Sequence, residues 1–220
     1  MKQKNFTHTK NILQDELLSE ENESGRYYST PEGKYPSVTT VTGWEKRKFF
    51  AEWRKNNPEE AKRTVNRGNK LHKLIEKYLN NEKIIKKEVD PFTLDLFLQI
   101  KQNLDKIDNI HASEVPLYSN LLKLAGRVDC IAEFDGELSV IDFKGSTKQK
   151  RVEDIENYFL QATAYSIMWK ERTGVPIKKI VIMISCEDGG VQIFESNPVK
   201  HVPALKLCIE KYEREANATI

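Results

Sequence analysis

The chain has 220 residues, of which 39% are hydrophobic and 31% charged, and 35 Lys and Arg against 33 Asp and Glu give a formal net charge of +2. This balance can bury a core and excludes a chain that is disordered throughout. No run approaches the roughly 18 apolar residues that a membrane span needs. Residues 1–23 are too polar for a signal peptide and too acidic for a transit peptide. We therefore expect a cytoplasmic protein that does not bind a membrane.

The cysteines limit the cofactor chemistry. Cys130, Cys186 and Cys208 are far apart and odd in number. Neither a disulfide framework nor a cluster held by four thiolates can be built from them. We expect no iron-sulfur cluster.

Charge is distributed unevenly along the chain. Residues 1–25 are acidic and predict a mobile or peripheral arm. Residues 44–89 contain fourteen Lys and Arg against seven Glu, an excess that suits the phosphate backbone of a nucleic acid. Aromatic residues are interleaved with this charge, and two interpretations stay open: they stack on bases, or they face the core of an amphipathic helical region. These aromatic residues are Trp44, Phe49, Phe50 and Trp53.

Residues 26–109 are expected to form a hairpin followed by helices. The hairpin turns at Pro31-Glu32-Gly33, because Pro fixes φ and Gly tolerates positive φ. Pro58 suits the first turn of a helix that runs to about Leu79. Another helix begins after Asp90, an N-cap residue followed by a proline.

The periodicity changes at residue 110, where an α/β region begins that we expect to extend to residue 220. Residues 110–118, 122–134 and 137–143 predict an antiparallel meander, with a tight Asp-Gly turn before the last strand. A helix over 152–172, a buried strand over 177–186, a strand over 191–195 and a helix from 198 onward complete the order βββαββα.

Acidic residues on the meander are candidates for a metal site. Asp129 lies on the second strand and Asp142 on the third, and they share a side of the sheet if the register allows. Lys144, two residues after Asp142, shares its face. Carboxylates are costly to bury without a cation, and oxygen ligands suit Mg²⁺ or Mn²⁺. Glu114 on the first strand is a further candidate, while ordinary surface charges are the alternative for each residue.

Three short motifs give these residues a family resemblance. The segments 126–129, 142–144 and 161–165 read GRVD, DFK and QATAY, which resembles the GxxD, DxK and QxxxY series of the RecB-like branch of the PD-(D/E)XK nuclease superfamily. Residues 67–76 resemble the helical histidine motif of that branch. Residues 35–41 are similar to the PSVT segment of the mitochondrial genome maintenance exonuclease group and its bacteriophage relatives. The resemblance implies a restriction-endonuclease-like core, a mixed sheet flanked by helices, with a helical N-terminal elaboration.

The resemblance also implies roles for individual residues. His72, Asp129, Asp142 and the main-chain carbonyl of Phe143 would bind the metal, whereas a helix histidine bonded four residues on, to Glu76, is the alternative for His72. The residues expected to be catalytic are Lys144, Asp142, Asp129 and Glu114. Those expected to contact substrate are Gln161, Tyr165, Ser37, Thr39, Arg67, Lys70, Ser146, Lys148 and Lys150, although the hydroxyls near residue 37 could instead cap a helix.

The activity implied is that of an Mg²⁺- or Mn²⁺-dependent DNA exonuclease. Similar proteins act on strands threaded beneath a helical arch, and residues 44–89 are the candidate arch. We therefore expect single-stranded DNA, or frayed and flapped ends, as substrate, in replication, recombination or repair in a bacterial or bacteriophage-infected cell. A helicase, polymerase or recombination protein is a candidate partner, since the sequence has no GxxxxGK[ST] motif. The alternatives are a structure-specific endonuclease and a non-catalytic DNA-binding scaffold.

Overall fold

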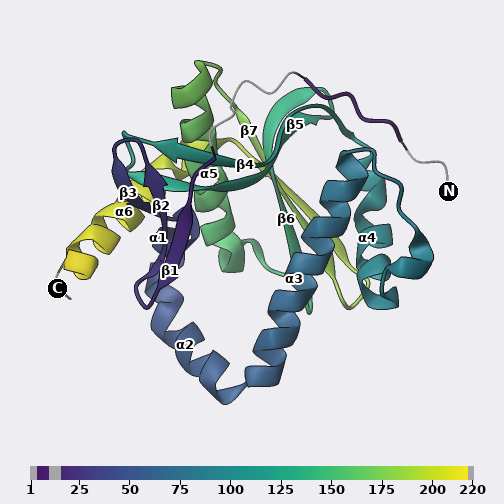
Figure 1. Cartoon of the computed structure of the whole chain (residues 1–220), viewed down its shortest axis with the longest axis horizontal. Helices are drawn as coiled ribbons and strands as arrows, with labels where there is room; N and C mark the ends of the chain where they lie inside the picture. The colour runs from purple at the N-terminus through teal and green to yellow at the C-terminus, as the bar shows by residue number, and fades with distance from the viewer. Residues whose placement is uncertain (1–3, 10–15, 218–220) are drawn as a thin grey trace.

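A five-stranded mixed sheet organises the molecule (Figure 1). The computed structural model describes residues 4–9 and 16–217. The strand order follows the chain; the first three strands and the last pair are antiparallel, and the third and fourth strands are parallel. This confirms the expected α/β fold. The strands are β4 (Ile107–Ser119), β5 (Leu124–Phe134), β6 (Glu137–Ser146), β7 (Lys179–Cys186) and β8 (Val191–Ser196).

Helices cover both faces of this sheet. On one face lie α5 (Glu156–Thr173) and α6 (Val202–Asn217), and on the other α3 (Pro58–Leu79) and α4 (Pro91–Leu104). Strand β7 is buried on both sides because its side chains alternate between the two cores, as the continuous apolar run predicts. Among the described residues, no helix is long and apolar enough to cross a membrane.

The N-terminal hairpin has a third strand that the sequence did not predict. Strands β1 (Ser19–Asn22), β2 (Gly25–Thr30) and β3 (Gly33–Pro36) form an antiparallel sheet of their own. The turn at residues 31–33 lies between β2 and β3, as expected. Strand β1 comes from the acidic segment and remains exposed along its length.

Residues 4–9 also differ from the expected separate arm. Phe6 is only 3% exposed, and its ring packs edge-on against Tyr78 with a centroid distance of 5.1 Å. The Thr9 N–H donates to the carbonyl of Ile110 at 2.9 Å. An aromatic side chain and a strand-like contact therefore tie this segment to the core, while residues 10–15 of the expected arm lie outside the described part. The expected domain boundaries remain predictions.

Two helices project from the body as a V (Figure 1). A short helix, α1 (Val38–Thr42), precedes α2 (Arg47–Asn56), which runs away from the sheet, and α3 begins at Pro58 and returns. Helix α2 buries none of its residues. Both interpretations of the aromatic residues thus hold in part: Trp44 is buried against Tyr212 of α6, whereas Phe49 and Phe50 are 65% and 44% exposed.

Candidate active site

The site begins where strands β5 and β6 separate. Their paired register starts at Phe134 and Glu137 and ends at Cys130 and Ile141. Just beyond this last pair, the Phe143 N–H donates to Oδ2 of Asp129 at 2.9 Å. In an extended strand the N–H and C=O of one residue point toward the same neighbouring strand. The Phe143 carbonyl, predicted as a metal ligand, therefore faces the same side as Asp129.

A backbone irregularity directs Glu114 into the site. Its φ of 53° lies in the left-handed region, which is uncommon for a residue other than glycine. Ala112 and Val115, on either side, both face the same core, so the regular alternation of side chains is broken between them. The guanidinium of Arg127 donates to the Glu114 carbonyl and fixes this turn of the backbone.

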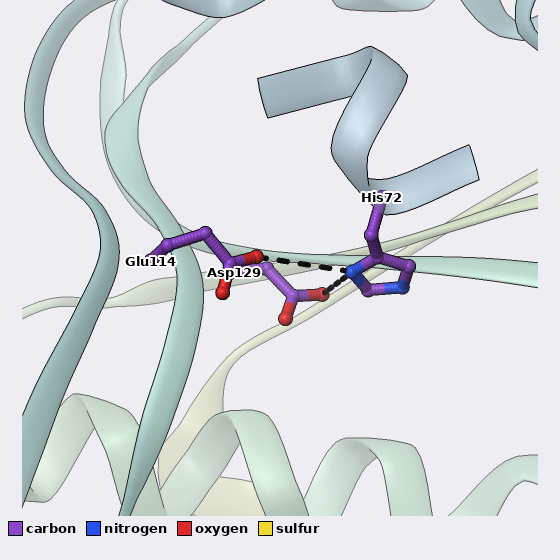
Figure 2. Close-up of side chains that lie close together, drawn as sticks. All are labelled: His72, Glu114 and Asp129. Atoms are coloured by element: carbon purple, nitrogen blue, oxygen red, sulfur yellow. Dashed lines mark ion pairs between the residues drawn. The ribbon is translucent and has the colours of Figure 1, made fainter. Parts of the chain in front are cut away.

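His72 joins the two carboxylates from helix α3. Its Nδ1 lies 3.9 Å from Oε1 of Glu114 and 3.7 Å from Oδ2 of Asp129 (Figure 2). Leu71 and Ile75, its neighbours on α3, are buried and anchor the helix that carries it. Burial opposes protonation of the imidazole, but the carboxylates outweigh it and raise the pKa of His72 to about 9.

Asp142 and Lys144 form a buried ion pair beside this group. Nζ of Lys144 donates to Oδ1 of Asp142 at 2.6 Å, and Asp142 is 2% exposed. Burial raises the pKa of Asp142 to about 6, against the lowering effect of the Lys144 ammonium. The other oxygen of Asp142, Oδ2, is buried and has no hydrogen-bond partner among the described residues.

These donors fit a divalent cation. One ligand atom from each of His72, Glu114 and Asp129 lies within 4.8 Å of the other two. The unsatisfied Oδ2 of Asp142 is a further acceptor, and a buried polar atom without a partner is costly unless a cation or water occupies it. Carboxylate oxygens suit hard divalent cations, and an imidazole suits divalent transition metals. The structure differs from the expected ligand set in that Glu114, and not Asp142, completes the group of three.

The group lines a cleft of about 600 Å³. The cleft also brings together Ser37, Thr39, Lys144, Gln161 and Tyr165, which the sequence predicted to act on or bind substrate. Ser37 additionally caps helix α1, accepting a hydrogen bond from the Thr40 N–H at 3.0 Å, so the capping alternative holds for it as well.

Further residues of the cleft were missed by the sequence reasoning. Asn69 precedes His72 by one helical turn, and Arg127 lies inside the GxxD motif, so spacing alone indicates both of them. Arg26 and Tyr28 lie on β2, a strand of the predicted hairpin, but nothing in the sequence indicates that this hairpin packs beside the cleft. The lining residues not predicted are Arg26, Tyr28, Thr64, Val65, Gly68, Asn69, Glu76, Gly126 and Arg127.

Five predicted substrate contacts lie outside the cleft, four of them basic. Arg67 is 6% exposed and forms an ion pair with Glu187, which follows β7. Nζ of Lys70 lies 3.1 Å from Oδ2 of Asp90. The remaining two, Lys148 and Lys150, belong to the loop after β6 and are not among the residues that line the cleft.

Ser146 also lies outside the cleft. Its hydroxyl donates to the Lys148 carbonyl at 2.6 Å, and its side chain is buried. This hydrogen bond closes the turn at the end of β6. The Ser146 hydroxyl is therefore directed into the loop after β6.

Gly126 on β5 and Tyr165 on α5 belong to two separate motifs and lie in close contact, where the helix packs on the sheet. A Cβ added at Gly126 would lie 2.6 Å from the Tyr165 hydroxyl oxygen and 3.1 Å from its ring. Tyr165 is 3% exposed, so its ring cannot move aside freely. The glycine of GxxD is therefore required by the tyrosine of QxxxY.

Replacing Gly126 by Ala should lower the free energy of unfolding by about 1–3 kcal/mol, the usual effect of overpacking a filled site. Urea denaturation measures it. Gly126→Ala combined with Tyr165→Phe should recover part of the loss, because the nearest clashing atom is removed. Gly68→Ala is the matched control: its Cβ would meet nothing within 4 Å, so in helix α3 it should stabilise by about 0.5–1 kcal/mol. Equal stability of Gly126→Ala and wild type would contradict the close contact.

The fold and the convergence of these residues define a nuclease core, and sequence comparison agrees: the profile of the PD-(D/E)XK nuclease superfamily matches residues 51–215. The chain belongs to this superfamily. Among curated proteins it is similar to mitochondrial genome maintenance exonuclease 1 from Mus musculus, with 32% identity over 101 residues, and from Homo sapiens, with 29% identity over 102 residues. Each match covers 44% of this chain and 29% of the relative.

A solved structure supports the fold. The crystal structure of a candidate exonuclease from Eubacterium rectale superposes with a TM-score of 0.50 at 13% sequence identity. The match covers 71% of this chain and 68% of that chain. At this identity the likeness concerns the fold alone.

Proposed function

We propose that this nuclease is a divalent-metal-dependent DNA exonuclease that acts on single strands or on frayed and flapped ends. The observation that carries the proposal is the convergence of His72, Glu114, Asp129 and Lys144 in one cleft, with the buried Asp142 paired to Lys144. These residues come from helix α3 and from the three consecutive strands β4, β5 and β6.

His72, Glu114 and Asp129 would hold Mg²⁺ or Mn²⁺, and the Phe143 carbonyl faces the same side as Asp129. The unpartnered Oδ2 of Asp142 is a further candidate acceptor. A cation held there supplies charge that polarises the scissile phosphate and makes water more acidic. Asp129 has a second task, because its hydrogen bond to the Phe143 N–H fixes the separation of β5 and β6.

Lys144 acts on the reacting groups themselves. Its Nζ lines the cleft and is held by Oδ1 of Asp142 at 2.6 Å. From this position the ammonium donates hydrogen bonds to the attacking water or to a phosphate oxygen, and it offsets the negative charge that develops in the transition state. Asp142 keeps Lys144 in place through the same ion pair.

Single strands fit the surroundings of the cleft. Arg26 and Thr39 line it and also line an adjoining hollow of about 440 Å³, to which α2 contributes Arg47, Phe50 and Arg54. Basic and aromatic side chains together suit a strand whose bases are unpaired. The V formed by α2 and α3 (Figure 1) is the candidate for the arch beneath which such a strand would pass.

Both similar proteins are exonucleases by name, which supports exonuclease action. We infer a role in DNA replication, recombination or repair, in the cytoplasm of a bacterial or bacteriophage-infected cell. A helicase, polymerase or recombination protein would then supply single-stranded ends.

Linear and closed-circular single-stranded DNA separate the proposed exonuclease from its alternatives. With Mg²⁺ or Mn²⁺ the protein should degrade end-labelled linear strands and spare the circle, because an arch admits only a free end, and EDTA should stop the reaction. Gel electrophoresis of timed samples measures both substrates. Cutting of the circle at the same rate would instead support a structure-specific endonuclease, and binding without cleavage under either metal would support a scaffold.

A further inference from the structure

A row of lysines runs along helix α3 outside the catalytic cleft. Lys70, Lys73 and Lys77 follow one another at intervals of three and four residues, so they share one side of the helix. Lys83, from the segment after α3, joins them. Together with Ile84 and Ile85 they line a hollow of about 420 Å³ between α3 and the segment that leads to α4.

The positive charge of this hollow is only partly compensated. Asp90 pairs with Lys70 at 3.1 Å, and Glu88 is the other carboxylate that lines the hollow. Within residues 4–9 and 16–217, no carboxylate oxygen lies within 4.0 Å of the ammonium groups of Lys73, Lys77 or Lys83, all of which are exposed. Three free ammonium groups side by side repel one another and favour an extended anion.

The hollow adjoins the catalytic cleft. Lys73 lines both of them, and it is adjacent in sequence to His72 of the candidate metal site. Lys77 lies one helical turn, about 6 Å, farther along the axis of α3. An anionic chain that leaves the cleft past Lys73 therefore meets Lys77 next and then Lys83.

We propose that Lys73, Lys77 and Lys83 form an outer track that binds the phosphate backbone of the substrate strand beyond the cleft. This inference rests on the proposed function, because the anion in the cleft is then a nucleic acid and its continuation carries one charge per nucleotide. Apolar Ile84 and Ile85 beside the lysines suit the sugars and bases of an unpaired strand. The track lengthens the binding site and favours long strands over short ones.

The double variant Lys77→Glu/Lys83→Glu tests the track, because its loss of affinity should depend on the length of the DNA strand. Fluorescence anisotropy in EDTA, with fluorescein-labelled oligothymidylate of 24 and of 4 nucleotides, measures the dissociation constants without cleavage. For the long strand we expect the dissociation constant to rise about 10-fold or more. The slope of the logarithm of the binding constant against the logarithm of the salt concentration should become shallower by about 1.4, since each of the two lost phosphate contacts contributes about 0.7 for a single strand. For the short strand, which cannot reach both sites, the affinity should change less than about twofold.

Lys200→Glu/Lys206→Glu is the matched control with the same change in net charge. Both lysines are exposed, and Figure 1 shows α6, which carries Lys206, at the far end of the molecule from α4. Should Lys77→Glu/Lys83→Glu fail to fold by circular dichroism, the milder Lys77→Gln/Lys83→Gln takes its place.

The outcomes separate the track from the proposed function. An unchanged affinity for the long strand, or an equal loss in both variant pairs, overturns the track. If the wild type binds through the track but cleaves no strand with Mg²⁺ or Mn²⁺, the track stands and the proposed exonuclease falls. If the wild type cleaves DNA but the lysine substitutions leave the affinity for the long strand unchanged, the proposed exonuclease stands and the track falls.

Discussion

Asp142→Asn should lower the rate of single-strand cleavage by at least about 10²- to 10³-fold, the usual loss when one charge-stabilising group is removed from an active site. Asn fills the same space, so the cause is electrostatic. Lys144 loses its charged partner, and the buried Oδ2, which has no partner among the described residues, is no longer anionic. Single-turnover cleavage with saturating Mg²⁺ measures the rate, and near-ultraviolet circular dichroism shows whether the fold is retained.

Asp95→Asn is the control for Asp142→Asn. It makes the same chemical change on the exposed side of helix α4, outside the cleft. We expect it to cleave at the wild-type rate. Full activity in a folded Asp142→Asn would remove Asp142 and its ion pair from the mechanism.

Asp129→Asn should weaken the binding of Mn²⁺ by at least about 10-fold, since even the loss of a residue that only supports a metal ligand costs 10- to 100-fold. The change removes one of three converging ligand groups and weakens the acceptor for the Phe143 N–H. Isothermal titration of the EDTA-treated, dialysed protein with Mn²⁺ measures the affinity. Higher Mn²⁺ concentrations should restore part of the cleavage, because the site is weakened and not abolished.

Glu76→Gln provides the comparison within the same cleft. Glu76 lines the cleft but does not belong to the group of three. Glu76→Gln removes one negative charge close to the site, as Asp129→Asn does. If Glu76→Gln binds Mn²⁺ about as tightly as the wild type, the loss in Asp129→Asn is due to the loss of a metal ligand. Equal losses in the two variants would mean that only the general negative potential matters.

Much of the fold could be predicted because local patterns and the buried surface agree. The Asp-Gly turn joins β5 and β6 with φ values of 50° and 79°, as a two-residue hairpin requires. Pro58 and Asp90 mark the starts of α3 and α4 at the predicted places. The continuous apolar run of β7 is buried on both faces.

The geometry of the site depended on features without a local signal. Glu114 reaches His72 only because its own backbone adopts a positive φ, and glutamate has no preference for that conformation. The separation of β5 from β6 at Asp129 depends on how the two strands pair, so the sequence of neither strand predicts it. The sequence therefore identifies Glu114 as a candidate, but it does not show that Glu114, and not Asp142, lies beside His72 and Asp129.

Arg67 illustrates a different limit. A basic residue five positions before His72 is as well suited to a phosphate as to a carboxylate. Its partner, Glu187, is 120 residues away in the sequence and becomes a neighbour only when β7 is placed beside β6. Motif spacing cannot predict contacts between residues so far apart in the sequence. Such contacts decide which basic residues remain available to a substrate.

Because α2 is exposed, there is a limit on how strictly an arch that contains it can select DNA strands with a free end. A helix of ten residues that buries none of them gains little from tertiary packing, and isolated helices shorter than about 12–15 residues are marginal in water. Its local unfolding therefore requires far less free energy than unfolding of the sheet. In the proposed arch, each such opening would admit a strand from the side. The fidelity of end selection would then be set by the unfolded fraction of α2 and would decline as the temperature rises, well before the core loses its structure.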